Sequence, residues 1–376
     1  MRILHVITDL HTGGAEIMLC NLLSATKRKR FDPVVISLIS RGTLGLRIEA
    51  LGVPIFALGM TSGWLLPHAV WCLAKLVRLV QPDIIHGWMY HGNLAASLAG
   101  AVSRSGAKVL WSIHNSLHDL TKEKRMTSAL IHLGATLSVF PDRIIYVSGV
   151  SLKQHEELGY SPRRSFVLPN GFDCERFKPS TSARFRIRGS LRLADDAFLI
   201  GSVGRYHPMK DHDNFLEAAG RLAVRRPNVH FVMVGQGVDQ TNYDLMKTIR
   251  NLKLDGRVHL LGLRANMPEI FAGFDIFSSS SLGEAFPVVI GEAMACGLPC
   301  VVTNVGDSAR IVGDTGKVVP PKDPDALADA ILKLMELPAE ERRRLGQKAR
   351  ERIGGHYSLD RIVGDYEKLY LDIATH

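Results

Sequence analysis

Short apolar runs alternate with segments of helical length through most of the sequence, and this alternation limits the folds that the chain can adopt. The first half contains six runs that we expect to form strands, at residues 3–8, 34–38, 84–86, 109–113, 144–147 and 166–168. Helix-length segments lie between them, among them residues 15–25, 65–80, 92–103 and 122–138. Continuous apolar strands that alternate with helices predict a parallel sheet buried on both faces, with right-handed crossovers.

Near the middle of the chain this pattern is interrupted. Residues 169–196 are polar, basic and turn-rich, so we expect an interdomain linker there. Alternation then resumes, with runs at residues 198–203, 229–234, 258–261, 276–278 and 300–303. A chain of 376 residues suits two cores better than one.

We therefore predict an α/β protein with two Rossmann-like, doubly wound parallel-sheet domains that face a central cleft. The first domain is expected to comprise residues 1–178 and the second residues 179–358. A helix-like segment, residues 359–376, is expected to cross back and pack on the first domain. Ligands of such sheets bind at the carboxyl ends of the strands, which makes the cleft the natural site.

The composition excludes several classes of protein. With 46% hydrophobic and 22% charged residues, it is typical of a soluble globular chain rather than a disordered one. No apolar run reaches the ~20 residues that a membrane-spanning helix needs. Five scattered cysteines without a CxxC pair predict reduced thiols, and the strand-like start of the chain predicts no signal peptide. We accordingly expect a cytoplasmic protein.

Basic residues are concentrated in the first half. Residues 1–178 contain 20 basic and 12 acidic side chains, a net charge of +8, whereas residues 179–376 carry +1. This asymmetry indicates an anionic partner: a lipid surface, a lipid-linked phosphate or a nucleic acid. A merely solvated surface is the alternative, because the charges form small clusters. Residues 64–74 form either an amphipathic helix on a membrane surface or, as we prefer, a helix packed on the sheet.

The segment from Ser278 to Pro299 carries the strongest signal for chemistry. A strand is expected to end near Ser280, a glycine turn to place Glu284, and Pro287 to begin a helix. Backbone N–H groups at such a helix start lack intrahelical acceptors and bind anions such as a diphosphate. The groups expected to do so here belong to Ala285, Phe286, Val288 and Val289.

Two carboxylates, Glu284 and Glu292, flank this expected anion site. A carboxylate repels a diphosphate, so we expect both to bind neutral hydroxyls, one on a sugar and one on a ribose. Taken singly, Glu284 is also explained as a capping residue and Glu292 as a surface acid of the helix.

Two further loops follow expected strands and so lie where parallel sheets bind ligands. Arg205 and Lys210 follow the strand at residues 198–203, where two cations can neutralise a departing diphosphate. A solvated basic loop is the alternative. Gly13 and Gly14 follow the first strand and allow the backbone to approach a ligand, although no complete GxGxxG fingerprint is present.

Together these motifs resemble family 4 of the retaining GT-B glycosyltransferases. The resemblance rests on the Gly-Gly-Ala-Glu loop, the Arg205 and Lys210 pair, the Pro-Asn-Gly-Phe-Asp turn, and the two glutamates with the Glu-Ala-Met-Ala-Cys-Gly-Leu-Pro segment. It covers nearly the whole chain. It implies that Arg205 and Lys210 hold the diphosphate, that Glu292 binds the ribose, and that Glu284 contacts the transferred sugar.

The resemblance implies further contacts to the donor. It places Gly14 near the phosphates and the loop backbone from Leu263 to Met267 near the base. His114 resembles the family's histidine beside the donor sugar, and we expect it to position the sugar rather than to abstract a proton. A satisfied buried histidine is the alternative for His114. Pro287 departs from the family pattern and leaves one backbone donor fewer for the phosphate.

The family further implies transfer of a sugar with retention, from a nucleotide-diphosphate-sugar to a glycan or lipid-linked acceptor. We expect a UDP-sugar donor, with GDP-mannose as the alternative, and the resemblance implies that neither a divalent metal nor a cofactor is required. The sequence contains no HExxH and no Cys/His framework, which predicts no zinc site. The expected setting is cell-surface polysaccharide assembly at the inner face of the cytoplasmic membrane, with peripheral contact through the basic first domain and without a nucleic-acid partner.

Two other functions stay open on the sequence alone. A nucleotide-sugar epimerase or hydrolase on the same scaffold would bind the same donor without an acceptor. A non-enzymatic protein that binds anionic surfaces would use only the basic first half, and its binding would fall steeply with salt.

Overall fold

The computed structural model describes residues 1–60, 67–103, 105–117, 125–194 and 196–375. The chain divides into two compact units, one made of Met1–Gly171 with Leu359–His376 and the other of Phe172–Ser358. The first boundary lies before the expected residue 178 because Phe172 already packs within the second unit. Its ring stacks on Phe286 at 5.9 Å, and its backbone N–H donates to the carbonyl of Tyr357 at 2.8 Å.

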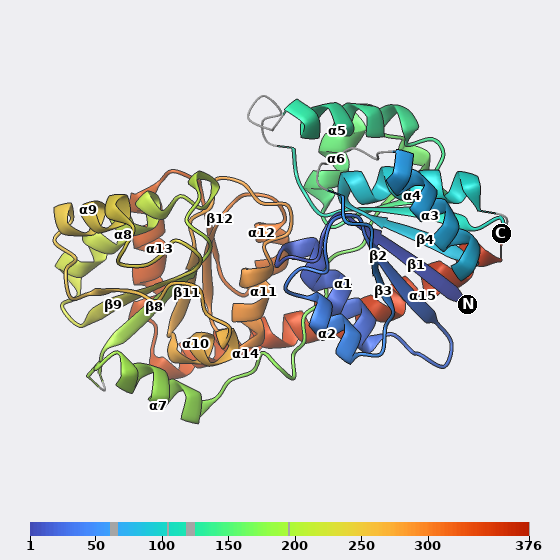
Figure 1. Cartoon of the computed structure of the whole chain (residues 1–376). Coiled ribbons are helices and arrows are strands. Elements are labelled where there is room, and N and C mark those ends of the chain that lie inside the picture. The colour runs from blue at the N-terminus through green and yellow to red at the C-terminus, as the bar shows by residue number, and fades with distance from the viewer. Residues whose placement is uncertain (61–66, 104, 118–124, 195, 376) are drawn as a thin grey trace. The chain divides into compact units, whose positions relative to one another are not determined.

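The first unit is built on a seven-stranded parallel sheet with the strand order β3-β2-β1-β4-β5-β6-β7 (Figure 1). Its strands are β1 (Arg2–Ile7), β2 (Asp32–Ser37), β3 (Ile55–Ala57), β4 (Ile84–Trp88), β5 (Lys108–Ile113), β6 (Arg143–Tyr146) and β7 (Ser165–Val167). Its helices are α1 (Gly14–Ala25), α2 (Gly45–Ala50), α3 (Pro67–Val80), α4 (Met89–Val102), α5 (Arg125–Leu137), α6 (Gly149–Glu157), the short 3₁₀ turn η2 (Pro162–Arg164) and α15 (Leu359–Ala374).

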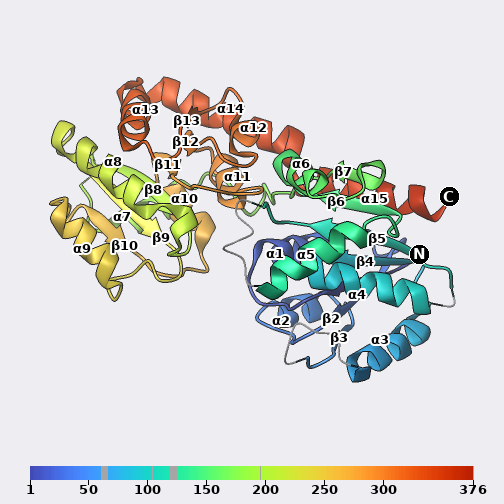
Figure 2. The same ribbon diagram turned by 90° about the horizontal axis from the view of Figure 1, so that it is seen from above.

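Helices cover both faces of this sheet because its strands are apolar on both faces. Along β1, Ile3 and Ile7 point into the core formed with α1 and α15, whereas Leu4 and Val6 point into the core formed with α3 and α4. This alternation follows from the two-residue period of a strand. Over the second face, α4 and α5 lie side by side (Figure 2).

The last helix, α15, belongs to the first unit and packs on α1 (Figure 1). Its apolar stripe of Ile362, Val363, Tyr366, Tyr370 and Ile373 repeats every three to four residues and is buried. The Tyr370 hydroxyl and His86 Nδ1 are 2.8 Å apart in the core. The segment expected to pack back on the first unit therefore does so.

The second unit is built on a six-stranded parallel sheet with the order β10-β9-β8-β11-β12-β13. Its strands are β8 (Phe198–Val203), β9 (Val229–Val234), β10 (Val258–Leu260), β11 (Ile276–Ser279), β12 (Cys300–Thr303) and β13 (Lys317–Val319). Its helices are α7 (Thr181–Ser190), the 3₁₀ turn η3 (Pro208–Lys210), α8 (His212–Arg225), α9 (Tyr243–Asn251), α10 (Met267–Gly273), α11 (Val288–Ala295), α12 (Ser308–Val312), α13 (Pro324–Glu336) and α14 (Ala339–Tyr357). Two doubly wound sheets confirm the predicted fold class.

The predicted linker at residues 169–196 is wrong over much of its length, because it contains α7. Two arginines of this helix, one turn apart, both bind the carboxylate of Asp275: Arg184 Nη2 lies 2.6 Å from Oδ1 and Arg188 Nη1 lies 3.3 Å from Oδ2. The basic residues that predicted a solvated linker thus include two arginines whose ion pairs attach α7 to the second unit.

Helix α3 packs Ala69, Leu73, Val77 and Val80 against the sheet, as the packed-helix alternative predicts, and leaves Trp71 exposed. Trp64 lies outside the described residues. Among the helices of the described residues, none combines the length and the apolar character needed to cross a bilayer.

We predict opposite effects for the same substitution at two glycines of the second unit. In Gly201→Ala the new Cβ would lie 2.0 Å from the Phe274 ring, so the free energy of unfolding should fall by about 1–3 kcal/mol. In Gly220→Ala the nearest atom is a side-chain carbon of Leu252 at 3.7 Å, and the helix should gain about 0.5–1 kcal/mol. Urea denaturation of both variants checks this, and equal effects would contradict the packing around Gly201.

Candidate active site

The loop after β8 brings Lys210 to the carboxyl edge of the second sheet. The backbone N–H of Gly204 donates to the carbonyl of Val234 at 2.9 Å, which continues the sheet for one residue past β8. The aliphatic part of Lys210 folds back over Gly204, where a Cβ would lie 3.2 Å from Lys210 Cδ. Asp211 then adopts a left-handed conformation with φ of 47°, and α8 begins.

Lys210 meets Glu284, as the sequence predicts for residues of one site. Lys210 Nζ forms an ion pair with Glu284 Oε1, and the same oxygen accepts a hydrogen bond from Ser281 Oγ at 2.7 Å. The side chains of Lys210 and Glu284 are 24% and 14% exposed, so the pair is only partly in water. A charge-assisted contact of this kind fixes both groups at the edge of the sheet.

The serines that precede Glu284 hold the two loops together. Ser280 Oγ donates to the carbonyls of Lys210 and Asp211, at 3.0 and 2.9 Å. The N–H of Leu282 donates to the carbonyl of Met209 at 2.8 Å. The position of the ion pair is therefore set by the backbone of both loops and not by the two side chains alone.

Arg205 lies on the same loop as Lys210 and is exposed. In the described parts of the chain, its guanidinium has no ion pair. The pKa of His207 is lowered by burial and then by the charges of Arg205 and Lys210, which shows that both cations act on the same region. The Arg205 carbonyl lies 3.1 Å from His212 Nε2, and Tyr206 stacks on the His212 ring. The loop thus presents two cations, of which Arg205 is the less constrained.

The start of α11 lies directly after Glu284. Pro287 occupies the N-cap and the helix begins at Val288, so the proline stands one position earlier than predicted. No side chain caps this helix, and across the described residues no acceptor is recorded for the four predicted N–H donors, those of Ala285, Phe286, Val288 and Val289. These donors and the partial positive charge of the helix start suit an anion.

A third loop approaches this helix start from behind. Gly306 has φ of 53°, and a Cβ on it would lie 2.3 Å from the carbonyl oxygen of Glu284. The N–H of Asp307 donates to the carbonyl of Ala285 at 3.1 Å. The Ala285 carbonyl is therefore bound by this loop, and the loop packs closely against the Glu284 carbonyl. The Phe286 ring is buried between Phe172 and Tyr357, so only its backbone is suited to a ligand.

Glu292 lies about one turn inside α11, in a different environment from Glu284. Burial raises the pKa of its carboxyl from the ordinary 4.5 to about 7, although the charge of Arg176 opposes this shift. Among the described residues it forms neither an ion pair nor a side-chain hydrogen bond. The structure places Glu284 and Glu292 on one segment but records no contact between them.

Leu263 and Met267 come from the loop after β10 and the first turn of α10. Leu263 is 76% exposed, and Met267 is half-buried. The preceding Gly262 bonds to the loop after β9 on both sides, through the N–H of Gly235 and the carbonyl of Val238. Leu263 thus offers an exposed apolar surface at the carboxyl edge of the same sheet, without a recorded contact to Lys210 or Glu284.

In the first unit, Gly13 and Gly14 begin α1 as predicted. Gly14 is exposed, with no atom within 4 Å of a Cβ built on it. Glu16 folds back over the helix start, since a Cβ on Gly13 would lie 2.3 Å from Glu16 Oε2. Burial raises the pKa of Glu16, and the charge of Asp9 adds to the shift. A carboxylate therefore lies at the predicted phosphate-binding loop.

His114 follows β5 and stacks on Trp88, with ring centroids 5.2 Å apart. Both of its ring nitrogens are buried, and among the described residues neither has a hydrogen-bond partner of good geometry; the same holds for Oδ1 of Asn170, which lies close to the ring. Burial lowers the pKa of His114 to about 4, and the nearby Asn170 opposes the shift. His114 is therefore neutral near pH 7, which suits hydrogen bonding better than proton abstraction.

The structure contains no obvious metal centre within its described residues: no group of three or more His, Cys, Asp or Glu side chains could hold a metal ion. What it brings together is the Lys210 and Glu284 pair, Arg205 on the same loop, and the uncapped start of α11. Arg205 and Lys210 supply two positive charges close to the backbone N–H donors at the start of α11. Such an arrangement can bind a diphosphate.

Comparisons with known proteins agree with this arrangement. Glycosyltransferase Family 4 matches residues 12–176, and Glycosyl transferases group 1 matches residues 183–352. The putative glycosyltransferase EpsF of Bacillus subtilis is 34% identical over 321 residues, which cover 81% of this chain and 79% of that protein. The chain belongs to glycosyltransferase family 4.

One further relative and one solved structure are similar to this family 4 glycosyltransferase. The UDP-Gal:alpha-D-GlcNAc-diphosphoundecaprenol alpha-1,3-galactosyltransferase of Escherichia coli is 28% identical over 318 residues, covering 81% of this chain and 79% of that protein. HepE of Anabaena, solved in complex with UDP, matches 99% of this chain and 100% of its own at a TM-score of 0.86 and 23% identity. That likeness establishes the fold, which is GT-B.

Several residues of this site were not singled out from the sequence of the glycosyltransferase. Ser280, Ser281 and Gly306 act through contacts that only the tertiary structure reveals. The run of four serines at 278–281 was visible, but nothing in it indicated which hydroxyl bonds to which loop. Asn170 lies in the Pro-Asn-Gly-Phe-Asp turn that carried the resemblance, yet its position beside His114 needed the fold.

The buried carboxyl of Glu292 predicts a pH-dependent stability. Between pH 4.5 and about 7 the unfolded chain ionises this group while the folded chain keeps it protonated, so stability falls as pH rises through this window and levels off above it. Glu292→Gln should remove about 2 kcal/mol of this dependence. Urea denaturation of wild type and variant from pH 5 to 8 measures it; a difference between them that does not change with pH would contradict the burial.

Proposed function

We propose that this glycosyltransferase moves a hexose from a UDP-sugar to a sugar carried on a polyprenyl diphosphate, with retention of configuration and without a metal ion. The observation that carries the proposal is the Lys210 and Glu284 pair at the uncapped start of α11. A cation is held there next to open N–H donors, and a carboxylate stands ready to bind hydroxyl groups.

The nature of the donor is supported by the relatives. The Escherichia coli relative takes UDP-Gal, and HepE has been solved with UDP and with UDP-glucose. GDP-mannose stays the alternative. The exposed Leu263 supplies an apolar surface for a planar base, and the proposed Glu292 contact supplies a hydrogen-bond acceptor for ribose hydroxyls.

In the proposed reaction the diphosphate is the leaving group. Arg205, Lys210 and the N–H groups of Val288 and Val289 stabilise the negative charge that develops as the bond from the anomeric carbon to the β-phosphate oxygen breaks. The acceptor hydroxyl bonds to the anomeric carbon from the same face, and its proton passes to the departing phosphate oxygen. UDP leaves with that proton, so no enzymic nucleophile is needed.

Glu284 and His114 are proposed to orient the donor sugar in this scheme. Glu284 accepts hydrogen bonds from sugar hydroxyls while Lys210 balances its charge. His114, neutral near pH 7, donates or accepts a hydrogen bond through a ring nitrogen that has no partner of good geometry among the described residues. Gly13 and Gly14 are proposed to let the backbone approach the phosphates.

The acceptor and the setting are proposed from the relatives and from charge. The acceptor of the Escherichia coli relative is an alpha-D-GlcNAc linked to diphosphoundecaprenol. A net charge of +8 on residues 1–178 favours such an anionic substrate at the inner face of the cytoplasmic membrane. The comparisons give no support to the epimerase alternative.

Replacing Lys210 tests the proposed leaving-group role. Lys210→Ala should lower the transfer rate by about 10²–10³-fold, since one cation that stabilises the departing diphosphate is lost. The measurement is transfer of radiolabelled sugar from UDP-glucose, UDP-galactose and UDP-N-acetylglucosamine to a synthetic prenyl-diphosphate-linked sugar. Lys247→Ala, on the exposed face of α9 in the same unit, is the matched control and should keep full activity. Full activity of Lys210→Ala would refute the assigned role.

Two properties of the reaction can be measured on the wild-type enzyme. Excess EDTA should change the rate by less than about twofold, because the cations and N–H donors replace a metal. Proton NMR of the product should show the anomeric configuration of the donor. A rate that collapses with EDTA and returns with Mg²⁺ would contradict metal independence, and an inverted product would contradict the proposed front-face route.

A further inference from the structure

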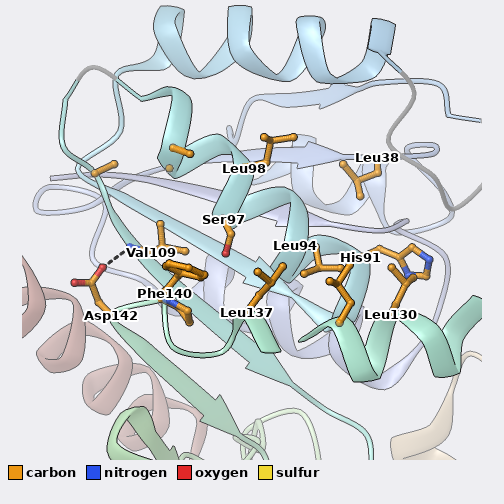
Figure 3. A pocket seen from close by; sticks show the side chains of 15 residues that line it. Leu38, His91, Leu94, Ser97, Leu98, Val109, Leu130, Leu137, Phe140 and Asp142 are labelled. Atoms are coloured by element: carbon orange, nitrogen blue, oxygen red, sulfur yellow. Dashed lines mark hydrogen bonds between the residues drawn. The ribbon is translucent and has the colours of Figure 1, made fainter. Parts of the chain in front are cut away.

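A groove with a volume of about 720 Å³ lies between α4 and α5, on the face of the first sheet that these helices cover (Figure 3). We call it the α4–α5 groove. Its floor includes Val109 of β5, and Leu38 closes one end. The volume is within the range of about 300–1,000 Å³ typical of small-molecule sites. None of the residues proposed for the donor lines it.

Two apolar stripes form the walls of this groove. Leu94, Leu98 and Ala101 repeat along α4 at intervals of four and three residues, and Leu130, Leu133 and Leu137 repeat along α5 in the same way. Residues at these spacings lie on one face of a helix. The two faces meet at Leu94 and Leu130 and leave a cavity between the other side chains, and Leu133 stays 46% exposed.

Besides His91 at one end, the lining has two polar side chains, Ser97 and Asp142, and both are already bound within the protein. Ser97 Oγ accepts a hydrogen bond from Trp111 Nε1 at 3.0 Å. Asp142 Oδ2 accepts one from the N–H of Val109 at 2.8 Å, and its other oxygen lies 3.7 Å from Lys108 Nζ (Figure 3). The groove therefore offers hydrocarbon surface, which suits an apolar chain and does not suit a sugar or a nucleotide.

The two ends of the groove differ in character. At the carboxyl edge of the sheet, beside His91, α4 begins, and the exposed Arg125 is the first residue of α5 that the structure describes. A helix start and a guanidinium attract an anion. At the other end Phe140 is 70% exposed, so a long chain can leave the groove there without burying a polar group.

We propose that the α4–α5 groove binds the polyprenyl chain of the acceptor next to its diphosphate. The diphosphate lies at the end with His91 and Arg125, the first isoprene units fill the groove, and the rest of the chain leaves past Phe140. This inference rests on the proposed function, because it takes the acceptor to be lipid-linked. It assigns the recognition of the lipid to the first unit and to residues outside the donor site.

The test measures binding of geranyl, farnesyl and geranylgeranyl monophosphate to the full chain, below their micelle concentrations, by displacement of a fluorescent fatty-acid probe. Each methylene that leaves water strengthens binding about fourfold, so affinity should rise at least about tenfold from farnesyl to geranylgeranyl monophosphate. Leu133→Glu puts a charge in the groove wall, and Ala101→Trp fills the space. Both should weaken geranylgeranyl monophosphate binding at least about tenfold.

Leu79→Glu is the matched control, because it introduces the same charge at an exposed leucine of α3 outside the groove. It should bind like wild type. Equal affinity in all variants, or no dependence on chain length, overturns the proposal. A second outcome also overturns it: Leu133→Glu binds prenyl phosphates normally but no longer sediments with phosphatidylglycerol vesicles. Leu133 would then contact a bilayer surface and not a bound prenyl chain. Circular dichroism confirms folding, and Ala101→Trp, which adds no charge, keeps the test valid if Leu133→Glu unfolds.

A thermal shift with UDP on the same proteins separates this inference from the proposed function. UDP should stabilise wild type and groove variants equally, since the groove holds no donor residue. Prenyl phosphate binding without any response to UDP or UDP-sugars would refute the proposed function and leave the groove assignment standing.

Discussion

In the second unit, the pairing of β8 with β11 determines which loops meet at the carboxyl edge of the sheet. The strand order turns at this pair, and ligands of doubly wound sheets bind at such a point. Lys210 follows β8 and Glu284 follows β11, so side chains 74 positions apart in sequence become neighbours. Gly201 permits the close packing, because the Phe274 ring occupies the space that a side chain on β8 would need. The strand order alone makes the two loops neighbours, and the contacts of the serines and of Gly306 then fix their exact positions.

The two glutamates show how one motif places chemically different acids. Glu284 is balanced by a lysine and a serine, whereas Glu292 lies one helical turn further on, in a buried place that raises its pKa to about 7. The two carboxyl groups therefore differ in ionisation because their surroundings differ, as is common for acids in active sites. In the first unit the same principle applies to Glu16, whose carboxylate folds over a helix start that would otherwise be open to an anion.

Much of the fold was accessible from the sequence, because long apolar strands and amphipathic helices have clear periods. The short strands β3 and β13 were missed, since three residues carry too little pattern to be distinguished from a loop. Helix α7 was mistaken for a linker because its arginines are basic for a structural reason that only Asp275 reveals. In the site, the motifs placed Lys210 and Glu284 in one cleft, but their ion pair was not predicted, because Lys210 was expected to bind the diphosphate and Glu284 neutral hydroxyls. The missing partners of His114 and the folding back of Glu16 depend on side-chain packing, which a sequence does not encode locally.

The backbone passes between the two units twice, and the two crossings are adjacent. Phe172 forms a β-bridge with Ser358, and a Cβ on Gly171 would lie 2.9 Å from Leu359 Cα. The second unit is thus inserted into the first, and its first and last residues are adjacent. The first unit combines the chain before the insertion with the last helix after it. A relative's second unit, cut at the same two junctions, can therefore replace this one without interrupting any strand or helix of the first unit.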